Sequence, residues 1–400
     1  MLLFYFIYLC FSFFFPFRST PMTRLFMFSW KRFMPLQQFT EDYNPHESAQ
    51  EQYYHAYADL GVHRVMLSDA PRMSFYRKAV TCETVVQDRV VVDVGSGTGI
   101  FSIWAARAGA KHVFSIEASS LSFFQARVID DNHLSEKITL LSETVENIVA
   151  GGVASFIATH EAVLKGCGVA AIVSEWMGFY LLHEGMLPSV IRARNFFGEV
   201  NAKLGVCRRI EMIPERATIR VAPMSCAPYC EERYCRFWSG LEGVDFSRYG
   251  TLECEMQLET SNPLIDTIPA SCLLHEGVVL AEVELSSITE DAMTSLCRTV
   301  HFSFCNSTAF QRHFGVNCTQ EVSVDGFTLW FDVSFREWTL NTSPSHPPTH
   351  WKQTTVLLPA TVRAERLVAF TNSDATLDAE VRLVATGTLR RCYTIEFELK

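Results

Sequence analysis

Hydrophobic and polar residues follow one pattern in the first half of the chain and another in the second. In the first half, short apolar runs alternate with longer segments in which apolar residues recur at three- and four-residue spacing. Such runs are typical of strands buried on both faces of a parallel sheet, and the longer segments are typical of helices that pack on it. We therefore predict strands and helices in βαβ order. The predicted strands are residues 89–94, 112–117, 138–141 and 169–174, and the predicted helices are 100–108, 120–130, 153–164 and one that follows Pro188 through Arg194.

The pattern changes at Pro214. From there apolar and polar residues alternate with a period of two, most clearly at 327–335 and 393–399. This alternation is typical of antiparallel strands with one buried face. Residues 226–255 interrupt it with aromatic and charged residues, and we predict a helical excursion from the β domain there.

The N-terminus begins with an apolar segment. Residues 1–17 contain a single polar residue, a serine, and are close to the roughly 18 to 20 residues that a membrane-spanning helix needs. No basic residue precedes the run, no small-residue cleavage site follows it, and Pro16 interrupts its end. We interpret residues 1–40 as an apolar or disordered leader, with a signal or membrane anchor as the alternative.

Composition limits the class of partner. The chain has 34 Lys and Arg against 44 Asp and Glu, a net charge of −10 with histidine neutral. Because this sign repels phosphate, we expect no direct nucleic-acid partner and expect basic peptides instead. The 13 cysteines lack the dense spacing of a disulfide framework, and the group Cys226, Cys230 and Cys235 lacks the paired halves of a zinc site. We predict reduced thiols and no metal.

A glycine-rich loop follows the first predicted strand. Gly95, Gly97 and Gly99 lie where the backbone approaches a ligand at the carboxyl edge of a parallel sheet. A dinucleotide fingerprint would need glycine where Ile100 stands, and no Lys-Ser/Thr pair follows for a phosphate loop. Glu117 ends the second strand, at the distance where an acidic side chain accepts hydrogen bonds from ribose hydroxyls. The pattern predicts a cofactor site.

Two glutamates share one apolar loop. Glu175 ends a predicted strand, and Glu184 follows nine residues later in SEWMGFYLLHEGM. Such a pair is costly to bury unless a cation lies between the carboxylates. A guanidinium fits, because it is planar, permanently charged and rich in donors, and two carboxylates can localise its charge away from one terminal nitrogen. Metal binding is the alternative, but no His, Cys or Asp cluster accompanies the pair at ligand spacing.

With these motifs in order, the chain resembles the protein arginine N-methyltransferase family from about Tyr53 to the C-terminus. The matching segments are YYHAYADLGVHRVMLSDAPR, VVDVGSGTG, SIEAS, SEWMGFYLLHEGML and the late THW. The resemblance implies a Rossmann-type class I methyltransferase domain followed by an antiparallel β-barrel with a helical dimerisation arm. The implied bounds are a helical lid at 41–75, the Rossmann-type domain at 76–213, and the barrel at 214–400 with the arm at 226–255.

The resemblance also assigns site residues. The implied catalytic residues are Glu175, Glu184, His350 and Asp69. The implied cofactor-binding residues are His63, Arg72, Asp93, Gly95, Gly97, Glu117, Val145 and Glu146. Among these, Arg72 would pair with the methionine carboxylate, Glu117 with the ribose and Glu146 with the adenine amino group. The implied substrate pocket contains Tyr53, Tyr57, Met66, Met186 and Trp351.

The implied activity is transfer of methyl from S-adenosylmethionine to arginine in proteins, by direct displacement and with S-adenosylhomocysteine as product. Met66 and Met186 match members that place the second methyl on the same nitrogen, so we expect monomethylarginine and then asymmetric dimethylarginine. We expect Gly/Arg-rich or histone-tail substrates, a homodimer, and a cytoplasmic or nuclear location.

Two alternatives remain open. The chain could be a non-catalytic partner subunit of an active paralogue, or a methyltransferase that acts on small molecules or nucleic acid. A dehydrogenase is disfavoured by Ile100.

Overall fold

The computed structural model describes residues 26–28, 53–54, 56–258, 263–304, 307–314, 321–358, 367–369, 376–386 and 392–399. Apart from the short strand β1 (Phe26–Phe28), the predicted leader lies outside these residues. Over the ranges just given, the helices are too short or too polar to cross a membrane.

The first domain is built on a parallel sheet with strand order β4-β3-β2-β5-β6. Its strands are β2 (Val90–Val94), β3 (His112–Ile116), β4 (Ile138–Leu141), β5 (Val169–Val173) and β6 (Glu211–Ile213). Every residue of β2, β3 and β5 is buried, which confirms the prediction of doubly covered strands. The chain moves outward from β2 to β4 and then returns to β5 on the other side of β2. The carboxyl ends of β2 and β5 therefore meet at a topological switch point, where open α/β sheets bind ligands.

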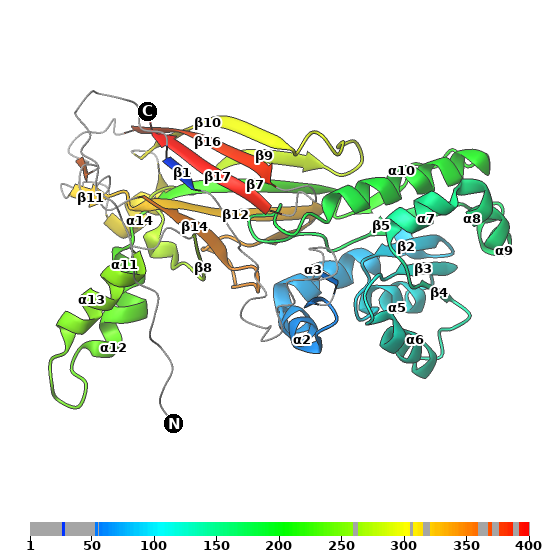
Figure 1. Cartoon of the computed structure of the whole chain (residues 1–400), viewed down its shortest axis with the longest axis horizontal. Coiled ribbons are helices and arrows are strands. Elements are labelled where there is room, and N and C mark those ends of the chain that lie inside the picture. Colours follow the sequence, from blue (N-terminus) through cyan, green and yellow to red (C-terminus); the bar gives the residue numbers. More distant parts are fainter. Residues whose placement is uncertain are drawn as a thin grey trace, which may run out of the picture.

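Helices cover both faces of this sheet. Figure 1 shows the helices from α7 to α10 on one side of the strands, and α5 and α6 on the other. The residue ranges are α5 (Ile100–Arg107), α6 (Ser122–Asp131), α7 (Val145–Gly151), α8 (Val153–Thr159), α9 (Glu161–Leu164) and α10 (Leu187–Lys203). The helix predicted for 153–164 is two short helices that meet at His160. The lid contains α2 (Leu60–Ser68) and α3 (Ala70–Val80), followed by α4 (Glu83–Val86).

The second domain contains two larger antiparallel sheets. The six-stranded sheet contains β8 (Leu264–Asp266), β14 (Gln353–Leu357), β12 (Gly326–Phe335), β7 (Arg216–Met224), β9 (Val278–Glu284) and β13 (Trp338–Asn341). The four-stranded sheet contains β1, β17 (Cys392–Leu399), β16 (Thr376–Thr386) and β10 (Ser295–Ser303), and a separate pair joins β11 (Glu321–Ser323) to β15 (Leu367–Ala369). The rings of Phe327 and Phe397 stack between the larger sheets with centroids 4.5 Å apart. Both belong to the alternating apolar series, so the predicted inward faces are confirmed.

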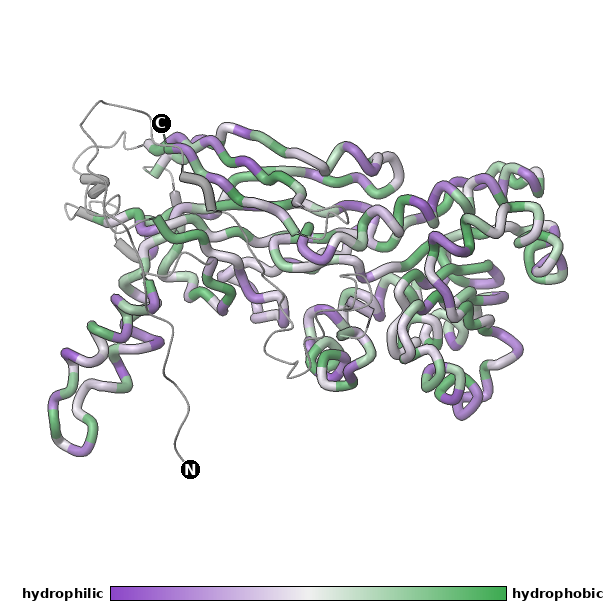
Figure 2. The backbone as a smooth tube through the Cα atoms, in the orientation of Figure 1, coloured by the Kyte–Doolittle hydropathy of each residue, from purple (hydrophilic) through white to green (hydrophobic). Residues whose placement is uncertain are grey.

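A helical arm leaves this domain between β7 and β8 (Figure 1). It comprises α11 (Ala227–Cys230), the π-helical turn η2 (Glu231–Cys235), α12 (Arg236–Trp238) and α13 (Ser247–Leu258). Hydrophobic and hydrophilic residues are mixed along it, as they also are along the barrel strands (Figure 2). The arm confirms the predicted helical excursion.

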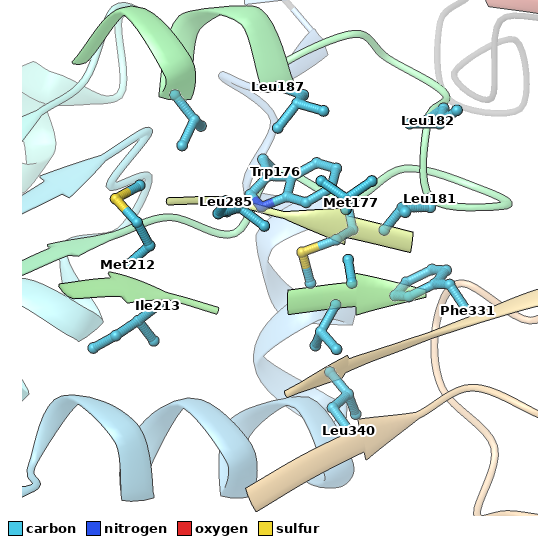
Figure 3. Packing of buried hydrophobic residues seen from close by; sticks show 14 of the residues in the cluster. Trp176, Met177, Leu181, Leu182, Leu187, Met212, Ile213, Leu285, Phe331 and Leu340 are labelled. Carbon is cyan, nitrogen blue, oxygen red and sulfur yellow. The ribbon is translucent and has the colours of Figure 1, made fainter. Parts of the chain in front are cut away.

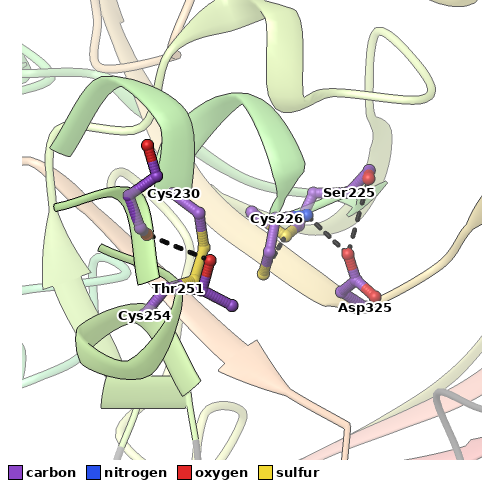
Figure 4. The surroundings of a disulfide bond; sticks show 8 residues. Ser225, Cys226, Cys230, Thr251, Cys254 and Asp325 are labelled. Carbon is purple, nitrogen blue, oxygen red and sulfur yellow. Dashed lines mark hydrogen bonds between the residues drawn. A yellow bond between two sulfur atoms is a disulfide. The ribbon is translucent and has the colours of Figure 1, made fainter. Parts of the chain in front are cut away.

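The prediction that the cysteines are all reduced thiols is wrong for one pair. A disulfide joins Cys230 of α11 to Cys254 of α13 (Figure 4). The two positions are 24 residues apart, and the fold of the arm brings their Cα atoms to 5.7 Å. At the base of the arm, the backbone N–H of Cys226 donates to Asp325 Oδ2 at 2.6 Å. The arm is thus held both internally and to the barrel.

The two domains share one apolar core at the segment that follows β5. Figure 3 shows Trp176, Met177 and Leu181 from this segment beside Leu285 and Phe331 of the barrel. Because these side chains are buried between the sheets, the loop that carries both glutamates is packed against rigid elements. Its carboxylates therefore occupy defined positions.

Candidate active site

A cavity of about 130 Å³ lies at the carboxyl ends of β2 and β5, beside the lid helices. Most of the predicted site residues line it. They are Tyr53, Tyr57, His63, Met66, Arg72, Gly95, Gly97, Glu117, Val145, Glu146, Glu175, Glu184 and Met186. Asp69, Asp93, His350 and Trp351 do not line it, and each has a supporting position described below.

The glycine loop forms one wall of the cavity. Gly95, Gly97 and Gly99 have φ angles of 71°, 54° and 78°, which side chains other than glycine rarely adopt. A Cβ added to Gly95 would lie 2.3 Å from Met186 Cε, and one added to Gly97 would lie 2.9 Å from His63 Cε1. The loop therefore fits directly against the lid and the double-glutamate loop.

Glu117 is fixed beside this loop. Its Oε2 accepts a hydrogen bond from the backbone N–H of Gly97 at 2.7 Å, and its Oε1 accepts one from Ser119 N at 2.8 Å. Each carboxylate oxygen retains a further lone pair. The carboxylate therefore fits the predicted role of accepting hydrogen bonds from a ribose.

Asp93 lies beneath the glycine loop, outside the cavity. Its Oδ2 accepts hydrogen bonds from the backbone and hydroxyl of Ser102, at 3.0 and 2.7 Å. Burial raises the pKa of Asp93 to about 7, against the hydrogen bonds from Ser102, which lower it. The residue supports the cofactor loop from below, and the structure does not place it in contact with the cavity.

Gln125 completes this support and was missed in the sequence. It is 1% exposed, and its Nε2 donates to Ser96 Oγ and Ser115 Oγ, each at 2.9 Å. A signal was present, because Gln125 lies four residues from both Leu121 and Ile129 on the buried face of α6. A lone polar residue on an apolar helix face needs a buried partner.

Glu175 holds a guanidinium of the chain itself. Arg72 Nε and NH2 lie 3.1 and 3.0 Å from Glu175 Oε2. The guanidinium also donates to the Met66 carbonyl at 3.2 Å and lies over the Phe101 ring. Arg72 also lines the cavity, so its pairing with a cofactor carboxylate stays a prediction beside the contact with Glu175.

Glu184 is held by the lid. The hydroxyl of Tyr57 donates to Glu184 Oε2. Burial and the nearby negative charge of Glu184 raise the pKa of Tyr57 well above its ordinary value, so the phenol stays a donor. Glu184 itself has a φ of 78°, which the tight loop around Gly178 imposes. Both glutamates thus face one cavity, each with a donor from the lid.

His350 and Asp69 form a pair behind the lid. His350 Nδ1 lies 2.6 Å from Asp69 Oδ2, and the His350 backbone N–H donates to the same oxygen at 2.8 Å. Burial alone would raise the pKa of Asp69, but the hydrogen bonds from His350 and from the Arg72 backbone outweigh it and lower that pKa. Asp69 also caps α3 through Arg72 N. The pair joins the lid to the late loop.

Trp351 was predicted in the substrate pocket and lies outside the cavity. It is buried, its ring packs edge-on against Phe331, and its Nε1 donates to the Met177 carbonyl at 2.8 Å. The side chain therefore supports the double-glutamate loop from the barrel side.

Glu146 belongs to a charged chain that crosses between the domains. Its Oε1 accepts from Ser189 Oγ at 2.8 Å and from Arg192 NH1 at 3.0 Å. The guanidinium of Arg192 also donates two hydrogen bonds to the carboxylate of Glu290 in the barrel, at 3.1 and 2.7 Å. Sequence reasoning missed Arg192, because its barrel partner is 98 residues away and no local pattern marks it.

This geometry defines a class of protein. A glycine cradle at the switch point, an acid at the end of the second strand and two carboxylates under a helical lid are the site of a class I methyltransferase. In the ranges described, no group of His, Cys, Asp and Glu is arranged to hold a metal ion.

Comparison with known proteins identifies the family. Residues 215–395 match the arginine methyltransferase oligomerization subdomain, and residues 79–173 match the ribosomal protein L11 methyltransferase family. The chain is 31% identical over 312 residues to protein arginine N-methyltransferase 1 of Schizosaccharomyces pombe, covering 77% of this chain and 79% of that protein. It is 31% identical over 343 residues to protein arginine N-methyltransferase 6 of Xenopus tropicalis, covering 83% and 88%.

Solved structures agree with this result. The crystal structure of PRMT6-SAH is 59% identical with a TM-score of 0.82, and the alignment covers 86% of this chain and all of that one. The chain belongs to the protein arginine N-methyltransferase family. Arginine N-methyltransferase activity goes with membership of this family, and the structure of PRMT6 is that of PRMT6-SAH.

Proposed function

We propose that the chain is a type I enzyme, which forms monomethylarginine and then asymmetric dimethylarginine in proteins. The observation that carries arginine as the acceptor is the convergence of Glu175 and Glu184 on the cavity of the glycine loop, with a guanidinium already lying on Glu175. Met66 and Met186, which line the same cavity, carry the product type. A carboxylate that holds one guanidinium has the geometry to hold another.

The cavity residues divide into those that hold the donor and those that hold the acceptor. The glycine loop, Glu117 and Glu146 hold S-adenosylmethionine, which supplies a methyl group on a positively charged sulfur. Glu175 and Glu184 bind the substrate guanidinium and localise its charge away from one terminal nitrogen. Alignment of that nitrogen is the main catalytic contribution of the chain.

Tyr57 acts on Glu184 inside the cavity, and His350 acts from behind the lid through Asp69. The Tyr57 hydroxyl keeps Glu184 oriented toward the acceptor, because it remains protonated. His350 is fixed through Nδ1 by Asp69 and carries the released proton outward.

The side chains that line the acceptor end of the cavity determine whether the second methyl goes to the nitrogen that carries the first. Met66 and Met186 both line the cavity, and Met186 Cε lies close against Gly95. We infer that these flexible side chains leave room for a second methyl on the nitrogen that carries the first. Mass spectrometry of methylated Gly/Arg-rich and histone-tail peptides tests this inference. Asymmetric dimethylarginine is expected, and symmetric product alone would contradict it.

The purified chain should methylate an arginine peptide without another subunit. Lysine peptides and RNA serve as competing acceptors in the same assay. Activity on lysine or RNA with none on arginine would exclude the proposal, and no activity without a paralogue would favour the partner-subunit alternative.

We also propose that the chain is a homodimer held by the arm. Residues 215–395 match an oligomerization subdomain, and the arm exposes large apolar side chains that the monomer leaves uncovered. Phe237 is 63% exposed, and Tyr249, Leu252 and Met256 of α13 are also exposed. Trp238 instead holds the arm together, since its Nε1 donates to Glu253 at 2.8 Å. Sedimentation of the wild type and Phe237→Ser tests the assignment, and an active wild-type monomer would refute it.

A further inference from the structure

A second cavity lies in the barrel domain and shares no lining residue with the active site. It has a volume of about 300 Å³ and lies between β7, β12, β13, α14 (Thr308–Phe314) and the loop 342–346. Figure 1 shows α14 at the end of the barrel from which the arm projects. We call this space the outer-face cavity.

The pairing of β12 with β7 and β13 places the side chains that form the floor of the cavity. Trp330 pairs with Arg220 across β12 and β7, and Asp332 pairs with Asn341 across β12 and β13. Residues two apart on a strand, and residues directly opposite on neighbouring strands, project to the same face of a sheet. The four side chains therefore share one face, opposite to the face that carries Phe331.

The floor is rich in hydrogen-bond donors. Arg220 Nε donates to Asp332 Oδ2 at 2.6 Å, which fixes the guanidinium and leaves its NH1 and NH2 without a partner in the described part of the chain. Trp330 is 2% exposed, and its Nε1–H has no partner among the same residues. Because this N–H is buried, a ligand in the cavity meets the indole ring of Trp330, and the donors open to it are those of Arg220.

The rim adds positive charge. Arg312 of α14 is exposed and forms no ion pair with any described residue. His346 Nδ1 lies 2.8 Å from Ser343 Oγ, and the imidazole is close enough to Asp332 to influence its titration.

The acceptors of the cavity are mostly occupied. Glu276 Oε1 accepts from the hydroxyl of Thr308 and from Ala309 N at 2.7 Å, at the start of α14. The charge of Asp332 is compensated by Arg220, and only its Oδ1 is buried without a partner. Burial raises the pKa of Asp332 even though Arg220 lowers it. Glu276 Oε2 lies 3.9 Å from His275 Nδ1 and stays open to solvent, so the cavity offers a ligand the guanidinium donors of Arg220 and Arg312 beside one acidic oxygen.

We propose that the outer-face cavity binds a ligand that carries an oxyanion, either a carboxylate or a phosphoryl group. Arg220 and Arg312 supply guanidinium donors, whose planar fork matches the oxygens of such a group. The ring of Trp330 forms an apolar wall with Leu273. The oxyanion can belong to a free inorganic ion or to an acidic residue of a partner polypeptide.

Calorimetric titration of the full chain tests the proposal with three probes. They are inorganic phosphate, an arginine-free peptide with one phosphoserine, and the same peptide with glutamate at that position. Saturable binding of at least one probe is expected. Binding of phosphate alone identifies a free anion as the ligand, and binding of a peptide alone identifies an acidic polypeptide.

Variants assign the binding to this cavity. Arg220→Gln and Arg312→Ala should each weaken binding by about tenfold or more, because each removes a charged donor. Arg298→Ala removes an exposed guanidinium from β10 and should change nothing. Asp332→Asn should strengthen binding, because it removes the negative charge beside Arg220; a cation site would respond in the opposite direction.

Three results would overturn the proposal. They are no saturable binding of any probe, binding that survives both arginine substitutions, and loss of binding in a folded Asp332→Asn variant. Arg312 lies on the rim, so its substitution gives a folded variant even if Arg220→Gln does not. Methylation of an arginine peptide should be unchanged in Arg312→Ala, which keeps this test separate from that of the proposed function.

Discussion

The guanidinium of Arg72 and the carboxylate of Glu175 form a buried ion pair across 103 residues of sequence. Their side chains are only 7% and 9% exposed. Because an isolated buried charge is costly, the pair ties the lid helix α3 to the double-glutamate loop. It also shows that Glu175 accepts a guanidinium in its present position.

Glu175→Gln should lower turnover by roughly 10²- to 10³-fold, because an amide cannot localise the charge of the substrate guanidinium. Binding of S-adenosylhomocysteine should stay within a few-fold of the wild type, since the glycine loop and Glu117 are untouched. Methyl-transfer assays and calorimetry measure the two effects. Turnover close to that of the wild type would show that the carboxylate of Glu175 is not needed for catalysis.

Tyr57→Phe should lower kcat/KM for the peptide by about tenfold, the effect of one lost hydrogen bond to a charged group. The affected bond is the one to Glu184, so the KM for the methyl donor should not change. Tyr229→Phe is the matched control, because its hydroxyl donates to Asp266 at the arm. An equal loss in both variants would mean that the effect is not specific to the site.

Gly95→Ala should raise the KM for S-adenosylmethionine by roughly tenfold or more, since its Cβ displaces Met186 in the cavity. Gly205→Ala separates this contact from backbone strain. Gly205 has a similar φ of 68°, but its added Cβ would meet open space. Both variants should lose about 1 kcal/mol of stability, and only Gly95→Ala should change the KM. An unchanged KM in Gly95→Ala would contradict the proposal that the glycine loop binds S-adenosylmethionine.

The raised pKa of Asp93 predicts that the stability of the chain depends on pH. Its pKa in the folded chain is about 7, above the ordinary value of 3.8, so the folded state holds the proton more tightly than the unfolded state. Stability should therefore fall as pH rises from about 4 to about 7 and then level off. Relative to the wild type, Asp93→Asn should gain on the order of 3 kcal/mol between pH 5 and pH 8. Urea denaturation of both proteins at the two pH values measures this difference, and parallel pH profiles would contradict it.

Because of the disulfide in the arm, we expect substitution of Cys230 or Cys254 to destabilise the arm more than substitution of its other cysteines. Cys254→Ser should lower the unfolding free energy of the arm by about 3 kcal/mol, because it releases a loop of 24 residues in the unfolded chain. Cys235→Ser removes a free thiol of the same arm and should have a much smaller effect. Peptide mapping without reductant detects the bond directly, and its absence from the purified protein would withdraw the prediction.

Local patterns in the sequence were sufficient for most of the elements, the glycine loop, Glu117 and the two glutamates, and the family resemblance supplied the other cavity residues. The buried runs at β2, β3 and β5 and the alternation at β17 depend on which faces of a strand are covered, and this periodicity is visible in a single sequence. The glycines and Glu175 could be predicted because each follows the end of a strand, and the carboxyl ends of parallel strands meet at one edge of a sheet; Glu184 follows in the same loop.

Tertiary structure alone decided which residues are partners. Arg72 on Glu175, Arg192 between Glu146 and Glu290, and the bond between Cys230 and Cys254 all join positions that are far apart in sequence. It also placed Asp93 and Trp351 behind the cavity rather than in it. The physical reason is that residue type and spacing determine local conformation and burial, whereas the pairing of charges and thiols depends on how separate elements pack in three dimensions.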